Sequence, residues 1–162
     1  MRSGPVLIAY DGSPAAEHAL REAGGLIGGR PALLTVVWMQ GLGFELLETP
    51  TSSLGIPPAT IDIRTALEMD EAMGERAQRL AEQGAHLARD VGFEAEALVV
   101  ADEVEVDVAE TIVDVARKRD AQAIVIGAHG HGGAAEVILG STTRSVVRHA
   151  PCPVLVVREQ ER

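Results

Sequence analysis

The chain has 162 residues, a length typical of one domain with a sizeable core, and 46% of them are hydrophobic, which excludes a disordered chain. Its formal net charge of −10 argues against nucleic-acid binding, because phosphate repulsion would require a basic patch that the sequence lacks. The single cysteine, Cys152, excludes an intrachain disulfide and is typical of a reducing compartment, and no apolar stretch has the length of a membrane span. We therefore expect one cytoplasmic domain over residues 1–162, without a nucleic-acid or membrane partner.

The first half of the chain alternates β-rich runs with a helical pattern. Residues 6–10 predict a strand, and Ser13 followed by Pro14 is a capping residue and first-turn proline that begin a helix. Gly28 and Gly29 end that helix, and residues 32–39 predict the second strand of a βαβ unit. Residues 40–63 hold no period and are rich in Gly, Pro, Ser and Thr, so they predict a long loop.

The second half continues the same alternation. A helix is expected over residues 65–91, a strand over 94–101, and a further helix after Asp107, which stands three residues before Glu110 as in a capping box. Residues 121–126 predict a strand, residues 141–149 a helix and residues 154–157 a last strand. Regular alternation of this kind predicts an α/β fold with about five strands in a parallel sheet.

A glycine-rich segment follows the strand at residues 121–126. Gly127, Gly130 and Gly140 are separated along it, and Ser141 then begins a predicted helix. Glycine lets a ligand approach the backbone and reaches positive φ without strain. Exposed amides followed by the free N–H groups of a helix start favour phosphate oxygens. The segment therefore indicates a nucleotide site.

Three alternatives for this segment are weaker. A Walker loop needs a lysine after its glycines, and residues 127–143 contain none. A dinucleotide fingerprint, G-x-G-x-x-A, fits residues 130–135, but the second strand and acid that should follow it are replaced by the turn at Pro151. His129 and His131 lack a third metal ligand nearby, so a metal site is disfavoured.

The spacing Gly127-x2-Gly130-x9-Gly140-Ser141 is similar to the ATP-binding motif of the universal stress protein family. The likeness extends to Asp11-Gly-Ser after the first strand, to residues 34–37 and to residues 148–157. This resemblance implies a single-domain three-layer sandwich of the flavodoxin-like or Rossmann-like type (adenine nucleotide alpha hydrolase-like), with a five-stranded, mostly parallel sheet. It also implies a homodimer that pairs the apolar edge strand Val154–Val157.

The resemblance implies a role for each matching position. Residues near the adenosine would be Ala9 and Asp11, and the backbone of Val36 would meet the adenine edge. Residues beside the ribose and phosphates would be Ile126 and Gly127. The phosphates would be cradled by amides and hydroxyls of Gly130, Gly140, Ser141, Thr142 and Thr143.

These expectations add up to an ATP-binding module for stress response or regulation, with ATP bound with or without Mg2+. No nucleophile–base pair is visible in the sequence, so we do not expect an efficient enzyme. Two other functions stay open: a stress adaptor that binds AMP, a cyclic nucleotide or no nucleotide, and a weak ATP hydrolase on the same scaffold. The acidic loop at residues 101–107 leaves the closure of one side of the pocket undetermined.

Overall fold

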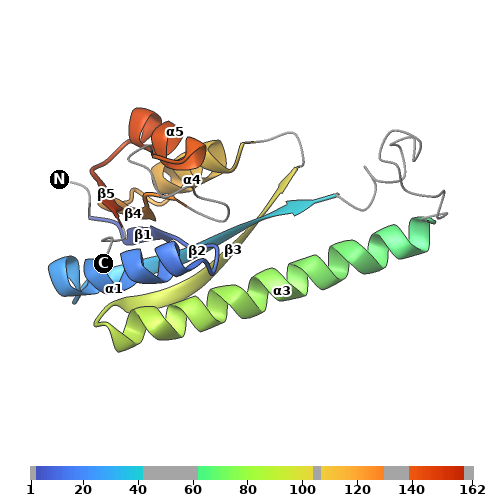
Figure 1. Ribbon diagram of the computed structural model, residues 1–162, viewed down its shortest axis with the longest axis horizontal. Coiled ribbons are helices and arrows are strands. Elements are labelled where there is room, and N and C mark those ends of the chain that lie inside the picture. Colours follow the sequence, from blue (N-terminus) through green and yellow to red (C-terminus); the bar gives the residue numbers. More distant parts are fainter. Residues whose placement is uncertain (1–2, 42–61, 104–106, 130–138, 159–162) are drawn as a thin grey trace.

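The computed structural model describes residues 3–41, 62–103, 107–129 and 139–158, and their strands form one sheet (Figure 1). Every strand pair in this sheet is parallel, and the strand order is β3-β2-β1-β4-β5. The strands are β1 (Val6–Ala9), β2 (Pro31–Gln40), β3 (Glu94–Glu103), β4 (Ala123–Gly127) and β5 (Val154–Val157). The five-stranded parallel sheet confirms the fold class predicted from the sequence.

Helices cover both faces of the sheet and complete the three-layer sandwich (Figure 1). They are α1 (Pro14–Ile27), α3 (Ile63–Asp90), α4 (Val108–Lys118) and α5 (Ser141–His149). Helices α1 and α3 pack against one face, whereas α4 and α5 pack against the other. Within the described ranges, no helix combines the length and the apolar character that crossing a membrane would require.

Two separate cores result from the alternation of side chains along the strands. Val6 and Ile8 of β1 are buried toward α1 and α3, and Leu7 between them is buried toward α4 and α5. Helix α3 approaches the sheet closely through small residues: a Cβ on Gly84 would lie 2.5 Å from Leu34 Cδ2 and 2.8 Å from the Tyr10 ring. A core poor in aromatic residues is filled in this way by bringing backbones together.

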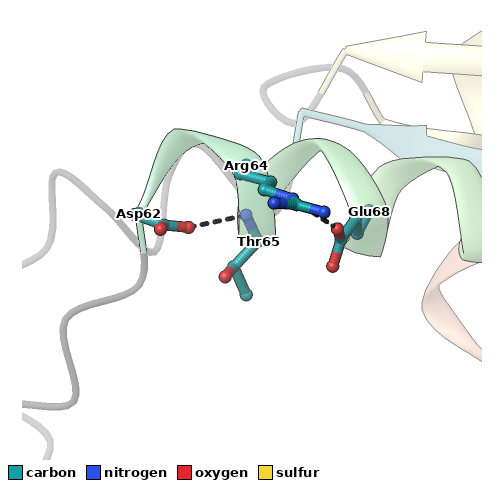
Figure 2. A network of polar contacts seen from close by, with 4 residues as sticks. All are labelled: Asp62, Arg64, Thr65 and Glu68. Atoms are coloured by element: carbon teal, nitrogen blue, oxygen red, sulfur yellow. Dashed lines mark hydrogen bonds and ion pairs between the residues drawn. The ribbon is translucent and has the colours of Figure 1, made fainter.

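Helix α3 begins two residues earlier than expected because Asp62 caps it. The Asp62 Oδ1 atom accepts a hydrogen bond of 2.8 Å from the Thr65 N–H (Figure 2). One turn further along, Arg64 Nε lies 3.1 Å from Glu68 Oε1, an exposed ion pair that Figure 2 also shows. Asp62 lies near the end of the predicted loop of residues 40–63. Most of that loop, residues 42–61, lies outside the described residues.

Strand β3 is two residues longer than predicted. It continues to Glu103, which pairs with Gln40 at the end of β2, so β2 and β3 extend well beyond the end of β1. The first part of the predicted acidic loop is therefore strand, and its residues 104–106 lie outside the described residues. Asp107 caps α4 as predicted, although its side chain accepts from the Ala109 N–H rather than from Glu110.

Candidate functional site

The strand order brings the carboxyl ends of β1 and β4 together at the centre of the sheet. The chain leaves β1 through α1 to reach β2 on one side, while β4 lies on the other side of β1. Helix α1 covers one face and α5 the other, so the helices that follow β1 and β4 lie on opposite faces of the sheet (Figure 1). In open α/β sheets such a switch point is the usual place for a ligand.

The turn that follows β1 is fixed by two side chains. Asp11 Oδ1 accepts a hydrogen bond of 2.9 Å from the Ser13 N–H, and Ser13 Oγ accepts one of 3.1 Å from the Ala16 N–H. Ser13 is buried, whereas Asp11 is exposed. Gly12 between them has φ +75°, and a Cβ there would lie 2.7 Å from Leu80 Cδ1 of α3. The turn therefore fixes the exposed Asp11 two residues beyond the end of β1.

The end of β4 is tied both to the edge strand and to α5. The Ala128 N–H donates to the Val157 carbonyl of β5 at 2.8 Å, and the Ala128 carbonyl accepts from the Gly140 N–H at 2.9 Å. The hydroxyl of Thr143 donates to the Gly127 carbonyl at 2.8 Å. These hydrogen bonds hold the first turn of α5 against the end of β4.

The N-terminus of α5 lacks a side-chain cap. Gly140 is the N-cap residue and offers no side chain, and the first turn of α5 contains no acidic residue. The first N–H groups of a helix have no acceptor within the helix and carry its positive partial charge. Of the hydroxyl residues in this turn, Ser141 is exposed, Thr142 is half-buried and Thr143 is buried. This helix end is chemically suited to an anion such as a phosphate group.

The structure brings most of the predicted site residues to the same edge of the sheet. Ala9 ends β1, and the register that pairs Ile8 with Val125 places Ala9 beside Ile126. Val36 is buried in β2, one residue beyond the last pairing with β1. Gly140, Ser141, Thr142 and Thr143 follow at the start of α5. Gly130, like His131, lies outside the described residues.

The two described glycines of the motif have ordinary backbone angles, so what distinguishes them is the room that a side chain would need. A Cβ on Gly127 would lie 3.1 Å from the Ala15 carbonyl oxygen, so β4 ends too close to α1 for a larger residue. Gly140 has φ −56°, which any residue adopts, and a Cβ there would lie 3.5 Å from the Ala128 oxygen, an ordinary contact. Of the two motif glycines that the structure describes, neither has positive φ, whereas Gly12 in the turn after β1 has φ +75°.

Sequence reasoning missed two features near the site. Tyr10 lies buried directly before Asp11, and burial raises the pKa of its phenol, with the nearby carboxylates of Glu17 and Asp11 adding to the rise. Leu80 contacts the Gly12 turn from a helix about seventy residues away, which no local pattern reveals. Among the described residues, no group of three His, Cys, Asp or Glu side chains could hold a metal ion.

A sequence model of the universal stress protein family matches residues 55–158. The chain belongs to the universal stress protein family. It is 31% identical over 159 residues to a putative universal stress protein of Staphylococcus aureus strain USA300, covering 96% of this chain and 84% of that relative.

Solved structures of universal stress proteins share the fold. Universal stress protein UspA from Lactobacillus plantarum has a TM-score of 0.65 at 25% identity, and the match covers 98% of this chain and 99% of UspA. A universal stress protein from Archaeoglobus fulgidus in complex with dAMP has a TM-score of 0.58 at 24% identity, with coverage of 96% and 98%. The family resemblance stated from the sequence motifs is thereby confirmed.

Proposed function

We propose that this universal stress protein binds an adenine nucleotide at the carboxyl ends of β1 and β4, as a regulatory module rather than an efficient enzyme. The observation that carries the proposal is the uncapped N-terminus of α5, which is held against the end of β4, the strand that pairs with β1 and so lies beside the strand that leads into the Asp11 turn. An anion-binding helix end and a nearby carboxylate suit the two halves of a nucleotide. The phosphates fit the helix end, and the ribose hydroxyls can donate to Asp11.

The proposed site assigns the residues as the family motif does, except for Thr143, whose hydroxyl is donated to the Gly127 carbonyl oxygen. Asp11 and Ala9 contact the adenosine, and the backbone of Val36 meets the base. Ile126 and Gly127 border the ribose and the phosphates. The phosphates are bound by the Gly140–Thr142 amides and hydroxyls, together with Gly130. We propose ATP, with or without Mg2+, as the ligand, and an intracellular location in keeping with the single cysteine.

A nucleoside monophosphate is the second candidate. The A. fulgidus protein was solved in complex with dAMP, and we take a nucleoside monophosphate as the alternative ligand of this chain. The exposed hydroxyl of Ser141 and the amides of the first turn are sufficient for one phosphate group. ATP and AMP differ in the number of phosphates that the glycine-rich segment before α5 and the start of α5 must hold, so their relative affinities separate the two candidates.

Calorimetric titration with ATP, ADP, AMP and cyclic AMP, with and without Mg2+, tests the proposal. Gly140→Val should abolish detectable binding, because its branched side chain covers the first-turn amides, while the fold stays intact. Replacing an N-cap glycine by valine costs on the order of 1 kcal/mol of stability. Gly25→Val, at an exposed position with no atom within 4 Å of the added Cβ, is the matched control and should bind as the parent does.

Two results would contradict the proposal. If none of the four nucleotides bound the parent chain, nucleotide binding would be refuted. If Gly140→Val bound as tightly as the parent, the ligand would lie elsewhere on the molecule. Rapid release of inorganic phosphate from bound ATP would favour the hydrolase alternative over the regulatory role.

We also propose that the chain forms a homodimer through β5. This strand lies at the edge of the sheet and pairs within the described residues only with β4, and all four of its residues are half-buried and apolar. An apolar edge strand offers unpaired N–H and C=O groups to a second copy. Sedimentation of the full chain should give twice the mass of one copy, and a monomer at micromolar concentration would refute the dimer.

A further inference from the structure

We infer that the Thr143 side chain is a positioning group for the proposed phosphate site and not a ligand of the phosphate, an inference that rests on the proposed function. Thr143 lies in the first turn of α5, beside Ser141 and Thr142, and the family motif groups it with the phosphate-binding residues. The structure distinguishes Thr143 from Ser141 and Thr142 by its burial. Its side chain is directed inward and is only 3% exposed, whereas Ser141 is exposed.

The hydroxyl of Thr143 already donates a hydrogen bond within the protein. A threonine hydroxyl carries one proton, and that proton is donated to the Gly127 carbonyl oxygen at 2.8 Å. A phosphate oxygen needs a donor, and the remaining lone pairs of Thr143 Oγ1 would repel it. The Thr143 side chain therefore cannot hold a phosphate without breaking a buried hydrogen bond that nothing else in the first turn replaces.

The direction of the Gly127 carbonyl explains why this bond matters to an anion. The Ala128 N–H points to β5, where it donates to Val157. In a trans peptide the preceding carbonyl points the opposite way, so the Gly127 oxygen faces the side of β1, which ends at Ala9. Without Thr143 this partly negative oxygen would face the end of β1, where the nucleotide is proposed to bind. The hydroxyl covers it and so removes a source of repulsion from the site.

The same bond sets the place of the helix end. The α5 N-terminus has no side-chain cap, and it is held to the end of β4 by the Gly140 N–H to Ala128 bond and by the Thr143 hydroxyl. Loss of the hydroxyl leaves one of these two attachments. The first-turn N–H groups would then no longer be held in a fixed position relative to Asp11, and the part of the affinity that depends on phosphate would fall.

Titration of adenosine, AMP and ATP into Thr143→Val and the parent tests this inference. We expect AMP and ATP to bind roughly tenfold more weakly to Thr143→Val, while the affinity for adenosine stays within about twofold of the parent. Thr143→Ser restores the hydroxyl and should recover phosphate-dependent affinity. Thr143→Ala, which differs from Thr143→Ser only in the hydroxyl, provides the same comparison should the valine variant not fold.

Thr111→Val is the matched control. Thr111 is a buried threonine in α4 whose hydroxyl donates to Asp102 of β3, so the variant loses a comparable bond that does not involve α5 or β4. Its affinities for all three ligands should equal those of the parent. Three results would each overturn the inference alone. Thr143→Val could bind AMP and ATP as the parent does, it could lose equal affinity for adenosine, or Thr143→Ser could fail to recover affinity. Absence of binding by the parent would overturn the proposed function and this inference with it.

Discussion

Two adjacent glycines near the end of α1 should respond in opposite ways to the same substitution. A Cβ on Gly24 would lie 2.5 Å from the Val91 carbonyl oxygen and 2.7 Å from Val91 Cγ2, where α3 ends against α1. A Cβ on Gly25 would have no atom within 4 Å. We therefore predict that Gly24→Ala destabilises the protein and that Gly25→Ala stabilises it.

The magnitude follows from comparing the two variants with each other. Replacing a helical glycine by alanine favours the helix by roughly 1 kcal/mol, and this gain is common to both variants. The difference between them is then the cost of the crowded contact at Val91. Overpacking a well-packed contact typically costs about 1–3 kcal/mol, and much of the crowding here involves a backbone oxygen that cannot rotate away. For a chain of this length each kcal/mol shifts the midpoint by roughly 2–4 °C, so the two midpoints should differ by about 2–12 °C.

Thermal unfolding of the parent and both variants, followed by circular dichroism under one set of conditions, measures this difference. Reversibility is checked by cooling and reheating each sample, because the comparison requires equilibrium midpoints. Equal midpoints for the two variants, or a higher midpoint for Gly24→Ala, would refute the close packing of α1 against the end of α3.

Two further predictions concern pH. The hydrogen bonds from the Thr65 backbone and side chain hold the pKa of Asp62 below its usual range, so its ionised form stabilises the start of α3 above the unfolded pKa and loses this effect as pH falls through the folded one. Urea unfolding of Asp62→Ala and the parent should therefore differ at neutral pH and converge on acidification; a difference that does not change with pH would contradict the cap. Burial raises the pKa of Tyr10, the only tyrosine of the chain, so the stability that it contributes is present below the unfolded pKa and is lost as pH rises through the folded one. Phenolate absorbance should titrate at a higher pH in folded than in urea-unfolded protein, and identical midpoints would rule out the burial effect.

Local sequence patterns predicted the elements of this fold with small errors at their ends. Helix α5 begins at Ser141 and ends at His149 as expected, and Ser13 caps α1 as its position before Pro14 indicated. The start of α3 at Ile63 was missed because the cap at Asp62 lies at the end of a stretch without hydrophobic period. The two extra residues of β3 were missed because they are acidic, and only their pairing with β2 reveals them as strand.

Part of the candidate site could also be predicted from sequence. The glycine spacing after a buried strand, together with Asp11, predicted residues that the structure places at one edge of the sheet. The separate role of Thr143 could not be predicted, because its hydrogen-bond partner, Gly127, lies sixteen residues earlier and across a strand–helix junction. The contact between Leu80 and Gly12 is likewise invisible to any pattern along the chain.

The sequence by itself determined the α/β alternation, the caps of α1 and α4 and the family, because periodicity, capping and motif spacing depend on residues within a few positions of one another. Only the tertiary structure decided which strand ends adjoin, which of two neighbouring glycines lies against the end of α3, and which of three hydroxyls in the first turn of α5 is donated to the end of β4. Those properties depend on the order of strands in the sheet and on the closeness of packed backbones. Both are set by contacts between residues far apart in the chain.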